Sequence, residues 1–548
     1  MFLLFTALSL ISFYYLFKKP RESSNMSVPS GPQGLPILGN ILQLGDRPHE
    51  KMFEWSNKYG PIYKVYLGSE LVVVLNGTDT VREALIQNEE EFAGRPKLYM
   101  IHATLKGKGL ISSPYNSDFN EHKKFLQTSL NKFGRRRSSL EVNCLQTIRE
   151  TLDEFRERID NNFEYTNSQM RNNISRIASQ NVLTMTFGTR MHDKKLFSHL
   201  MDLITENFEN TAVAAAFNFL PVTRIFKTFI LRNVLRCSEF LNNLISEKLE
   251  EYHEDMDEFD LPSEKYESNI IECYLKELLN NVCLYDKTVV ESLYATDRTA
   301  SYNCLSRRLT EKRRSSLSIE LVNSMNKFRR KSRYTSFSFD HLSSIVQDLF
   351  IAGTETISTS LNWAIIYAAK YSEYQDKLIN EIDGVLGKEK LPTESDRSKL
   401  NFVQAFLNET MRIVSAGPIL VPRSTTKDIV FRGFKIPENT FIMANIWSCM
   451  RDPHYWSEPN EFRPERFLDK YGNFVCKNPA MVPFGIGKRA CIGESIARLQ
   501  MFLIFTSLLQ KFHFSFAKSE ELNDEKLMKG IPGVGLSPPH ISLKLRLR

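Results

Sequence analysis

A single cysteine, Cys491, lies in the glycine-rich stretch PFGIGKRACIG at residues 483–493. The glycines let the backbone bend and approach a ligand closely, and Lys488 and Arg489 add positive charge to the same loop. Because the cysteine directly precedes an expected helix, the N–H groups at the helix start favour its thiolate form. A thiolate held in this way can bind a metal ion. The alternative is a buried structural cysteine in a glycine-rich turn.

A second stretch, AGTET at residues 352–356, interrupts a long apolar segment with a carboxylate and two hydroxyl groups. An acid and a hydroxyl on neighbouring residues, here Glu355 and Thr356, can organise a short chain of water molecules that delivers protons. Gly353 is expected to open the helix so that small molecules fit beside it. The alternative is an ordinary helix with a tolerated glycine and a solvent-facing Glu355.

A third pattern places Glu409 and Arg412 three residues apart on one face of an expected helix. Such a pair contributes less than about 1 kcal/mol when it is exposed to solvent. If the pair is buried, the loss of one partner leaves an unpaired charge in the interior, and the effect is much larger.

The elements that must position these residues are mostly helices. Long helices are expected at residues 341–370, which would run about 45 Å, at 398–414 and at 492–512. Residues 61–77 are expected to form a hairpin, and residues 428–445 a further short β region. No internal repeat is visible. The sequence therefore predicts one large domain that is mainly α with a minor β part.

The N-terminus carries an apolar run, residues 1–17, that has no charged side chain. A helix of this length spans roughly 25 Å and can cross a thin bilayer such as that of the endoplasmic reticulum. The basic residues after it should stay in the cytosol together with the rest of the chain. The alternative, a cleaved signal peptide, lacks a basic residue before the run and a cleavage pattern after it. We predict a transmembrane anchor at 1–17, a basic and proline-rich hinge at 18–40 and a catalytic domain at 41–548.

Charge and cysteine content limit the function further. The net charge is +7, and the segment 288–336 is basic and serine-rich, so it is predicted to be a solvated insertion. Nucleic-acid binding has no support, because no stacking aromatic side chains alternate with the charge. None of the eight cysteines forms a CxxC pair, which gives no support to a zinc ribbon and fits a reducing compartment.

The cysteine loop contains the pattern F-x-x-G-x-R-x-C-x-G, as Phe484, Gly487, Arg489, Cys491 and Gly493. With this pattern the chain resembles the cytochrome P-450 superfamily of haem-thiolate monooxygenases. The resemblance implies the fold of that superfamily, a haem b cofactor held in the loop, and an axial thiolate from Cys491 that promotes oxygen cleavage.

Other motifs of the superfamily follow in the expected order. The pair Glu409 and Arg412 resembles its E-x-x-R motif, and Arg466 in FRPERF resembles its P-E-R-F element. The resemblance implies that these three form a buried network that shapes the haem-binding core. It also assigns proton delivery to Glu355 and Thr356, because AGTET resembles the A-G-x-E-T motif.

One departure concerns the haem propionates. The superfamily usually has W-x-x-x-R in the helix before the basic cluster, but this chain offers Phe119 and Lys123. Phenylalanine lacks the indole N–H donor, and lysine lacks the fork of an arginine. Arg423 matches another propionate-binding position. Two consequences are open: the haem is held somewhat less tightly, or Arg423 and Arg489 carry more of the propionate pairing.

The anchor and hinge most resemble the microsomal class that oxidises drugs, steroids and fatty acids. This resemblance implies insertion of one atom of dioxygen into a lipophilic substrate, with electrons from a membrane-bound NADPH-cytochrome reductase and cytochrome b5 as a further candidate donor. The enzyme would lie on the endoplasmic reticulum membrane and face the cytosol, with Lys123, Lys124 and residues 135–137 on the docking face.

Two alternatives of other kinds remain: a haem-thiolate isomerase or dehydratase that needs no external electrons, and a non-catalytic haem-binding protein. The acid and threonine of AGTET favour the monooxygenase, because neither alternative needs them. The substrate pocket is expected to draw on residues 97–115, 208–229 and 416–421, on Phe350 and Ala352, and on the region near Val534. These segments are mostly apolar, which indicates a lipophilic molecule.

Overall fold

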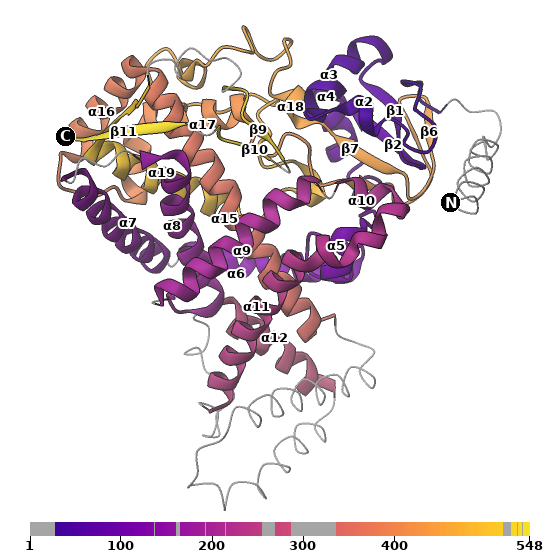
Figure 1. Cartoon of the computed structure of the whole chain (residues 1–548), viewed down its shortest axis with the longest axis horizontal. Helices are drawn as coiled ribbons and strands as arrows, with labels where there is room; N and C mark the ends of the chain where they lie inside the picture. The colour runs from indigo at the N-terminus through magenta and orange to yellow at the C-terminus, as the bar shows by residue number, and fades with distance from the viewer. Residues whose placement is uncertain are drawn as a thin grey trace, which may run out of the picture.

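The computed structural model describes residues 28–135, 137–160, 165–191, 193–213, 215–254, 269–285, 336–518, 528–533, 535–539 and 541–548. Helices account for most of these residues and short strands for a minor part (Figure 1), so the predicted balance of α and β structure is confirmed. Within these ranges, no helix is both long and apolar enough to span a bilayer. The predicted anchor at 1–17, its basic flank and nearly all of the insertion 288–336 lie outside the described residues.

The longest described helix, α15 (Phe339–Lys370), crosses the middle of the molecule in Figure 1. The hydroxyl of Ser338 caps its N-terminus by accepting from the His341 N–H. Most of its side chains are buried, because it packs against α8 (Asn167–Phe187), α17 (Asn401–Val414) and α19 (Glu494–Lys511). The expected helices at 341–370, 398–414 and 492–512 are therefore confirmed as α15, α17 and α19.

The other helices surround this group. They are α2 (Ile41–Leu44), α3 (Pro48–Tyr59), α4 (Thr78–Arg82), α5 (Tyr99–Leu105), α6 (Ser117–Arg135), α7 (Arg137–Asp160), α9 (Lys194–Val213), α10 (Ala215–Phe219), α11 (Lys227–Glu254), α12 (Ile270–Tyr285), α16 (Ser372–Leu386) and α18 (Ile446–Cys449). A π-helical turn, η1 (Glu83–Gln87), and the 3₁₀ turns η2 (Pro221–Phe226), η4 (Glu394–Lys399), η5 (Pro464–Phe467) and η6 (Gly487–Arg489) complete the set.

The main sheet has the strand order β1–β2–β7–β4. The predicted hairpin is confirmed as β1 (Ile62–Leu67) and β2 (Glu70–Leu75), which pair antiparallel. The parallel neighbour of β2 is β7 (Phe441–Ala444), which pairs antiparallel with β4 (Arg423–Ser424). The smaller sheets contain β3 (Tyr165–Thr166), β5 (Ile429–Phe431), β6 (Phe434–Ile436), β8 (Phe512–Phe516), β9 (Ile531–Pro532), β10 (Leu536–Ser537) and β11 (Ser542–Leu547). Strands β5 to β7 confirm the second predicted β region.

The described part of the hinge, residues 28–40, contains no helix and runs along the edge of the main sheet. The carbonyl of Ser30 accepts from the Lys64 N–H, and the side-chain oxygen of Asn40 accepts from the Tyr66 N–H. These bonds tie the proline-rich segment to strand β1, as a stiff connector requires.

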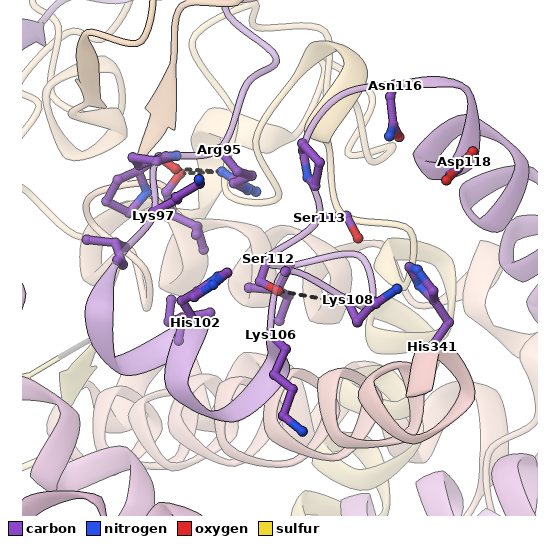
Figure 2. A pocket seen from close by; sticks show the side chains of 18 residues that line it. Arg95, Lys97, His102, Lys106, Lys108, Ser112, Ser113, Asn116, Asp118 and His341 are labelled. Carbon is purple, nitrogen blue, oxygen red and sulfur yellow. Dashed lines mark hydrogen bonds between the residues drawn. The ribbon is translucent and has the colours of Figure 1, made fainter. Parts of the chain in front are cut away.

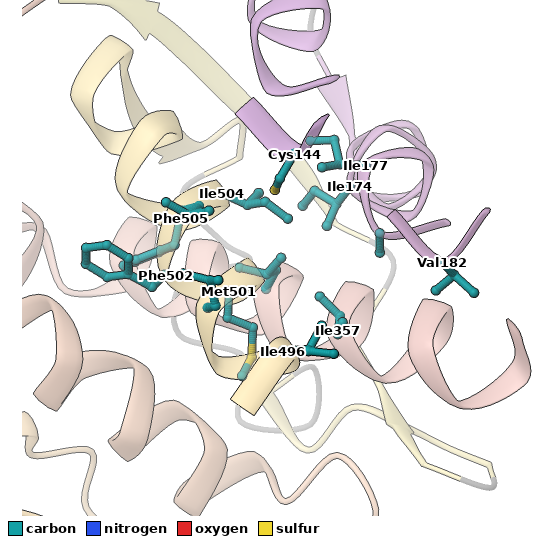
Figure 3. Packing of buried hydrophobic residues seen from close by; sticks show 14 of the residues in the cluster. Cys144, Ile174, Ile177, Val182, Ile357, Ile496, Met501, Phe502, Ile504 and Phe505 are labelled. Atoms are coloured by element: carbon teal, nitrogen blue, oxygen red, sulfur yellow. The ribbon is translucent and has the colours of Figure 1, made fainter. Parts of the chain in front are cut away.

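The largest hydrophobic core lies between the helices that carry the sequence motifs. Figure 3 shows Met501 and Ile504 of α19 gathered with Ile174 of α8 and Ile357 of α15. All four side chains are buried. Because α19 directly follows the cysteine loop, this core holds the C-terminal side of the loop against α15.

Candidate functional site

The cysteine loop is a tight backbone structure in front of α19. The Cys491 N–H donates to the Phe484 carbonyl over 2.9 Å, which closes the loop. Gly487 has a φ of +75°, and a Cβ atom at this position would lie 1.8 Å from the Leu85 carbonyl oxygen of η1. Gly493 lies beside the thiol, since its Cβ position is 3.9 Å from Sγ of Cys491. The missing side chain of Gly487 therefore lets the loop approach the backbone of η1, whereas a Cβ atom at Gly493 would only make ordinary contact with the thiol.

Replacement of Gly487 by alanine tests this close approach. Gly433 has a similar φ of +82°, but no atom lies within 4 Å of its Cβ position. We expect Gly433→Ala to cost about 1 kcal/mol for the left-handed backbone. Gly487→Ala should cost roughly 1–3 kcal/mol more, because a carbonyl must move. Urea unfolding of both variants measures the difference, and equal stabilities would contradict it.

Cys491 as a residue has surface exposed to solvent, and the Phe484 carbonyl holds it within the loop, where protein surrounds the thiol on its other sides. Burial by the surrounding protein raises the pKa of this thiol, and the N–H of Gly493 partly offsets that shift. The predicted effect of the helix start on the thiolate is therefore smaller than the effect of desolvation. A bound metal ion would remove the proton, because metal ligation requires the thiolate.

Three arginines gather near the loop, and the carboxylate of Asp348 partly offsets the effect of burial on the pKa of one of them, Arg95. Burial lowers the pKa of Arg489 to about 8, that of Arg423 to about 9 and that of Arg95 to about 10. Arg95 lowers the pKa of both other arginines further by charge repulsion. A cluster of desolvated cations is stabilised when an anion joins it.

Each of the residues predicted to hold the propionates is tied to a nearby backbone group. Arg489 lies over the ring of Phe119, 3.7 Å from its centre, and donates to three backbone carbonyls. Nζ of Lys123 donates to the Lys488 carbonyl over 2.5 Å. Nη2 of Arg423 donates to a carbonyl in the loop over 3.0 Å. The structure thus brings the predicted residues Phe119, Lys123, Arg423 and Arg489 together around the loop.

These residues fit a haem. Nη1 of Arg423 and Nε of Arg95 are buried and have no hydrogen-bond partner among the described residues. Two such donors suit the two carboxylates of a haem, and the accessible thiol of Cys491 suits its iron. Phe484 also lines the loop, with the guanidinium of Arg498 over its ring at 4.9 Å.

The AGTET stretch presents its residues to different sides of α15. Ala352 and Thr356 are exposed although the helix is otherwise largely buried, whereas Glu355 is fully buried. Oγ1 of Thr356 donates to the Ala352 carbonyl over 2.6 Å. The carboxylate of Glu355 forms an ion pair of 2.6 Å with Arg171 of α8. The hydroxyl therefore borders an accessible space, and the acid is held against α8.

Gly353 also faces α8. A Cβ atom at this position would lie 2.9 Å from Cγ2 of Val182. Close packing of α8 and α15 is thus one physical reason for a glycine here. The predicted role of Gly353 in opening the helix for small molecules stays a prediction.

The structure brings Glu409, Arg412 and Arg466 into one network. Nε of Arg412 lies 2.6 Å from Oε2 of Glu409, and Nη2 lies 2.8 Å from Oε1. Nε of Arg466 donates to the same Oε1 over 3.3 Å. Glu409 and Arg412 are fully buried. Arg412 also donates to the carbonyls of Met450, Pro459 and Glu461. This network joins α17 to the segment around η5.

Sequence reasoning missed Arg95, Arg171 and Asp348. Arg95 stands in the short string GRPK, and nothing in its spacing links it to the cysteine loop almost 400 residues later. Arg171 lies among other polar residues on a helix of mixed character. Asp348 precedes AGTET by one turn of the same helix, so its place on α15 could have drawn attention to it.

The chain is similar to known proteins over nearly its whole length. The family model described as "Cytochrome P450" matches residues 29–545. The chain is 31% identical to "Cytochrome P450 2C23" of Rattus norvegicus over 544 residues, which covers 98% of this chain and 96% of the relative. It is 30% identical to "Cytochrome P450 1A1" of Opsanus tau over 539 residues, with coverages of 94% and 89%. It is 27% identical to "Cytochrome P450 2U1" of Bos taurus, with coverages of 98% and 91%.

Proposed function

The chain belongs to the cytochrome P-450 family, and from this premise we propose that it is a membrane-anchored monooxygenase that inserts one atom of dioxygen into a lipophilic substrate. The family binds haem b through a cysteine thiolate, and the chain is accordingly a cytochrome P-450 monooxygenase by family. The observation that carries the proposal is the accessible hydroxyl of Thr356 next to the buried carboxylate of Glu355, in the middle of a buried helix.

Cys491 would hold the haem iron through its thiolate, and the bound haem would supply the reductive activation of oxygen. Arg95, Arg423 and Arg489 would pair with the haem carboxylates, whose negative charge would offset the repulsion among these arginines. Lys123 supports the loop through the Lys488 carbonyl. Cys491 itself is positioned by the hydrogen bond that its own N–H donates to the Phe484 carbonyl.

We assign the delivery of protons to Thr356 and Glu355. The Thr356 hydroxyl holds a water molecule at the accessible face of α15. The ion pair with Arg171 holds the carboxylate of Glu355 toward α8. Release of the carboxylate from Arg171 would let it exchange protons with that water.

The location and partners follow from the microsomal resemblance. We assign the enzyme to the endoplasmic reticulum membrane, facing the cytosol, with NADPH-cytochrome reductase as electron donor and cytochrome b5 as a second donor. Lys124 on α6 is exposed and is available for docking, whereas Lys123 already binds a backbone carbonyl.

Reconstitution tests this function. We expect the purified full-length chain, combined with NADPH-cytochrome reductase, to form a hydroxylated product from a lipophilic substrate only when NADPH and dioxygen are present. The alternative, an isomerase or dehydratase, would convert its substrate without reductase. Product formation that is independent of NADPH would therefore refute the monooxygenase proposal.

Thr356→Ala tests the proton route. We expect product formed per NADPH to fall by about 10²-fold, the lower end of what a positioned proton-transfer group contributes, while the carbon monoxide spectrum of the reduced protein stays intact. Ser360→Ala is the matched control, because Oγ of Ser360 donates to the carbonyl four residues earlier over 2.9 Å in the same way. If both variants formed the same amount of product per NADPH, the role of Thr356 in proton transfer would be contradicted.

A further inference from the structure

Four oxidisable aromatic side chains follow one another at the C-terminal end of α15. They are Trp363, Tyr367, Tyr371 and Tyr374, and the centres of successive rings are 5.9, 6.1 and 5.7 Å apart. The first three are spaced four residues apart, which places them on one face at the end of the helix. The fourth lies in the first turn of α16. We call these four residues the aromatic row.

The inner end of the aromatic row lies on the same helix as the predicted site. The first turn of α15 borders a cavity of about 370 Å³ beside α5, where Figure 2 shows His341 in the wall. Thr356 lies in the middle of the helix, and Trp363 follows it by about 10 Å along the axis. Nε1 of Trp363 donates to the Leu536 carbonyl over 2.9 Å, which fixes the ring. The row therefore begins about two helical turns from the residue assigned to proton delivery.

Exposure to solvent increases along the row. Trp363 is 1% exposed and Tyr367 is 8% exposed, whereas Tyr371 and Tyr374 are half-buried. Oη of Tyr374 donates to Oε2 of Glu465 over 3.3 Å, and the side chain of Glu465 is 41% exposed. The row thus runs from the interior to the surface and ends at a carboxylate that can accept a proton.

The proton of Tyr374 has a defined acceptor. Burial and the charge of Glu465 raise the pKa of Tyr374 to about 12, so the phenol keeps its proton at neutral pH. A tyrosine that loses an electron becomes strongly acidic and releases this proton. Nζ of Lys377 lies 3.2 Å from the other oxygen of Glu465 and holds the carboxylate in place. Loss of an electron and transfer of the proton can therefore occur together at this end of the row.

Packing explains the rings but not their types. Phe462 stacks on Tyr367 and Tyr371, with ring centres 4.3 and 5.4 Å apart, so the row belongs to a larger aromatic core. Phenylalanine would fill the same space, and it has no hydroxyl group that needs a partner when buried. Tyrosine and tryptophan can each give up one electron to a strong oxidant, whereas phenylalanine does not at the same potential. The succession of oxidisable rings therefore indicates electron transfer.

We propose that the aromatic row carries oxidising equivalents from the haem site to the protein surface, where an external one-electron reductant such as ascorbate removes them. Hydrogen peroxide, the oxidant, accepts two electrons and two protons at the haem site, its O–O bond breaks, and two molecules of water form. Each electron that leaves Tyr374 moves inward along the row, and the phenol proton passes to Glu465. Two molecules of ascorbate each return one electron and one proton. The row thus protects the haem from peroxide when no substrate is present.

Radical trapping on the purified full-length holoenzyme tests the proposal without reductase or substrate. Hydrogen peroxide is the oxidant, a nitrone spin trap marks the radicals, and peptide mass spectrometry locates the adducts. We expect the wild type to carry an adduct on Tyr374. Tyr367→Phe keeps a ring at its place but interrupts the row, so the adduct on Tyr374 should be lost although Tyr374 itself is present.

Tyr455→Phe is the matched control. The hydroxyl of Tyr455 also donates to a carboxylate, that of Asp79, but no aromatic ring of the described residues contacts this tyrosine. Its replacement should leave the adduct on Tyr374 unchanged. The carbon monoxide spectrum of each reduced variant, recorded before peroxide is added, shows that the haem site is intact.

The haem absorbance gives a second measurement. We expect ascorbate to slow the bleaching of the wild-type haem by hydrogen peroxide. This protection should be lost in Tyr367→Phe and in Tyr374→Phe, and it should be kept in Tyr455→Phe. Equal protection by ascorbate in all four proteins would overturn the proposal.

The adduct pattern can also overturn the proposal. An adduct on Tyr374 that persists in Tyr367→Phe excludes the row as the route. Adducts spread evenly over exposed tyrosines such as Tyr471, which is 76% exposed, show direct oxidation by peroxide in solution. The inference depends on the haem that the family binds and not on turnover. Failure of the monooxygenase proposal therefore appears separately, as absent NADPH-dependent product with the adduct on Tyr374 retained.

Discussion

Cys491→Ala is expected to abolish the thiolate-type carbon monoxide spectrum of the reduced protein and to reduce NADPH-dependent product formation to background. The reason is that no other side chain of the loop can place an anionic sulfur on the iron, since the loop contains a single cysteine. Cys491→Ser keeps the size of the side chain but replaces the thiolate by a poorly acidic hydroxyl. We expect it to lose the same signature, even where some haem is retained.

Cys476→Ser is the matched control for this loss. Cys476 is also exposed, and its sulfur lies 4.0 Å from the side-chain oxygen of Asn408. Its replacement should leave the spectrum and the activity close to those of the wild type. If the reduced protein kept its carbon monoxide spectrum after Cys491→Ala, another residue would be the ligand, and the site described here would have to be placed elsewhere.

Much of the fold can be predicted from the sequence, because the helices that position the site have strong local sequence patterns. The apolar run around α15 and the amphipathic pattern of α17 allow both helices to be predicted to within a few residues of their ends. The β1–β2 hairpin follows from two β-rich runs around a glycine. In each case residues close in the sequence decide the local structure.

The site was predicted only where a motif is continuous in the sequence. The cysteine loop is such a motif, and the pair Glu409 and Arg412 lies within one helical turn. Arg95 and Arg171 were missed, because each acts on residues that are distant in the chain and are reached only through tertiary packing. The directions of the AGTET side chains also depend on packing: Gly353 and Glu355 face α8, and no pattern within the stretch indicates which side α8 occupies.

Glu409→Gln is expected to destabilise the protein by about 3–5 kcal/mol, because it removes the negative charge from a buried network and leaves two guanidinium groups without their carboxylate. Arg412 is fully buried, and the side chain of Arg466 is 4% exposed, so water cannot take the place of the lost charge. The free energy of unfolding in urea, followed by far-ultraviolet circular dichroism and by haem absorbance, measures the change.

Arg463→Gln is the control for this prediction, because it breaks an ion pair with Glu458 in the same region that is 38% and 57% exposed. An exposed pair contributes less than about 1 kcal/mol, so the stability of the control should remain close to that of the wild type.

Arg412→Met should destabilise the protein as much as Glu409→Gln, since it leaves the carboxylate of Glu409 without its buried partner. The double variant should cost less than the sum of the two, because neither charge is then left unpaired. Additive effects, or a Glu409→Gln variant as stable as Arg463→Gln, would show that the network does not stabilise the core as a unit.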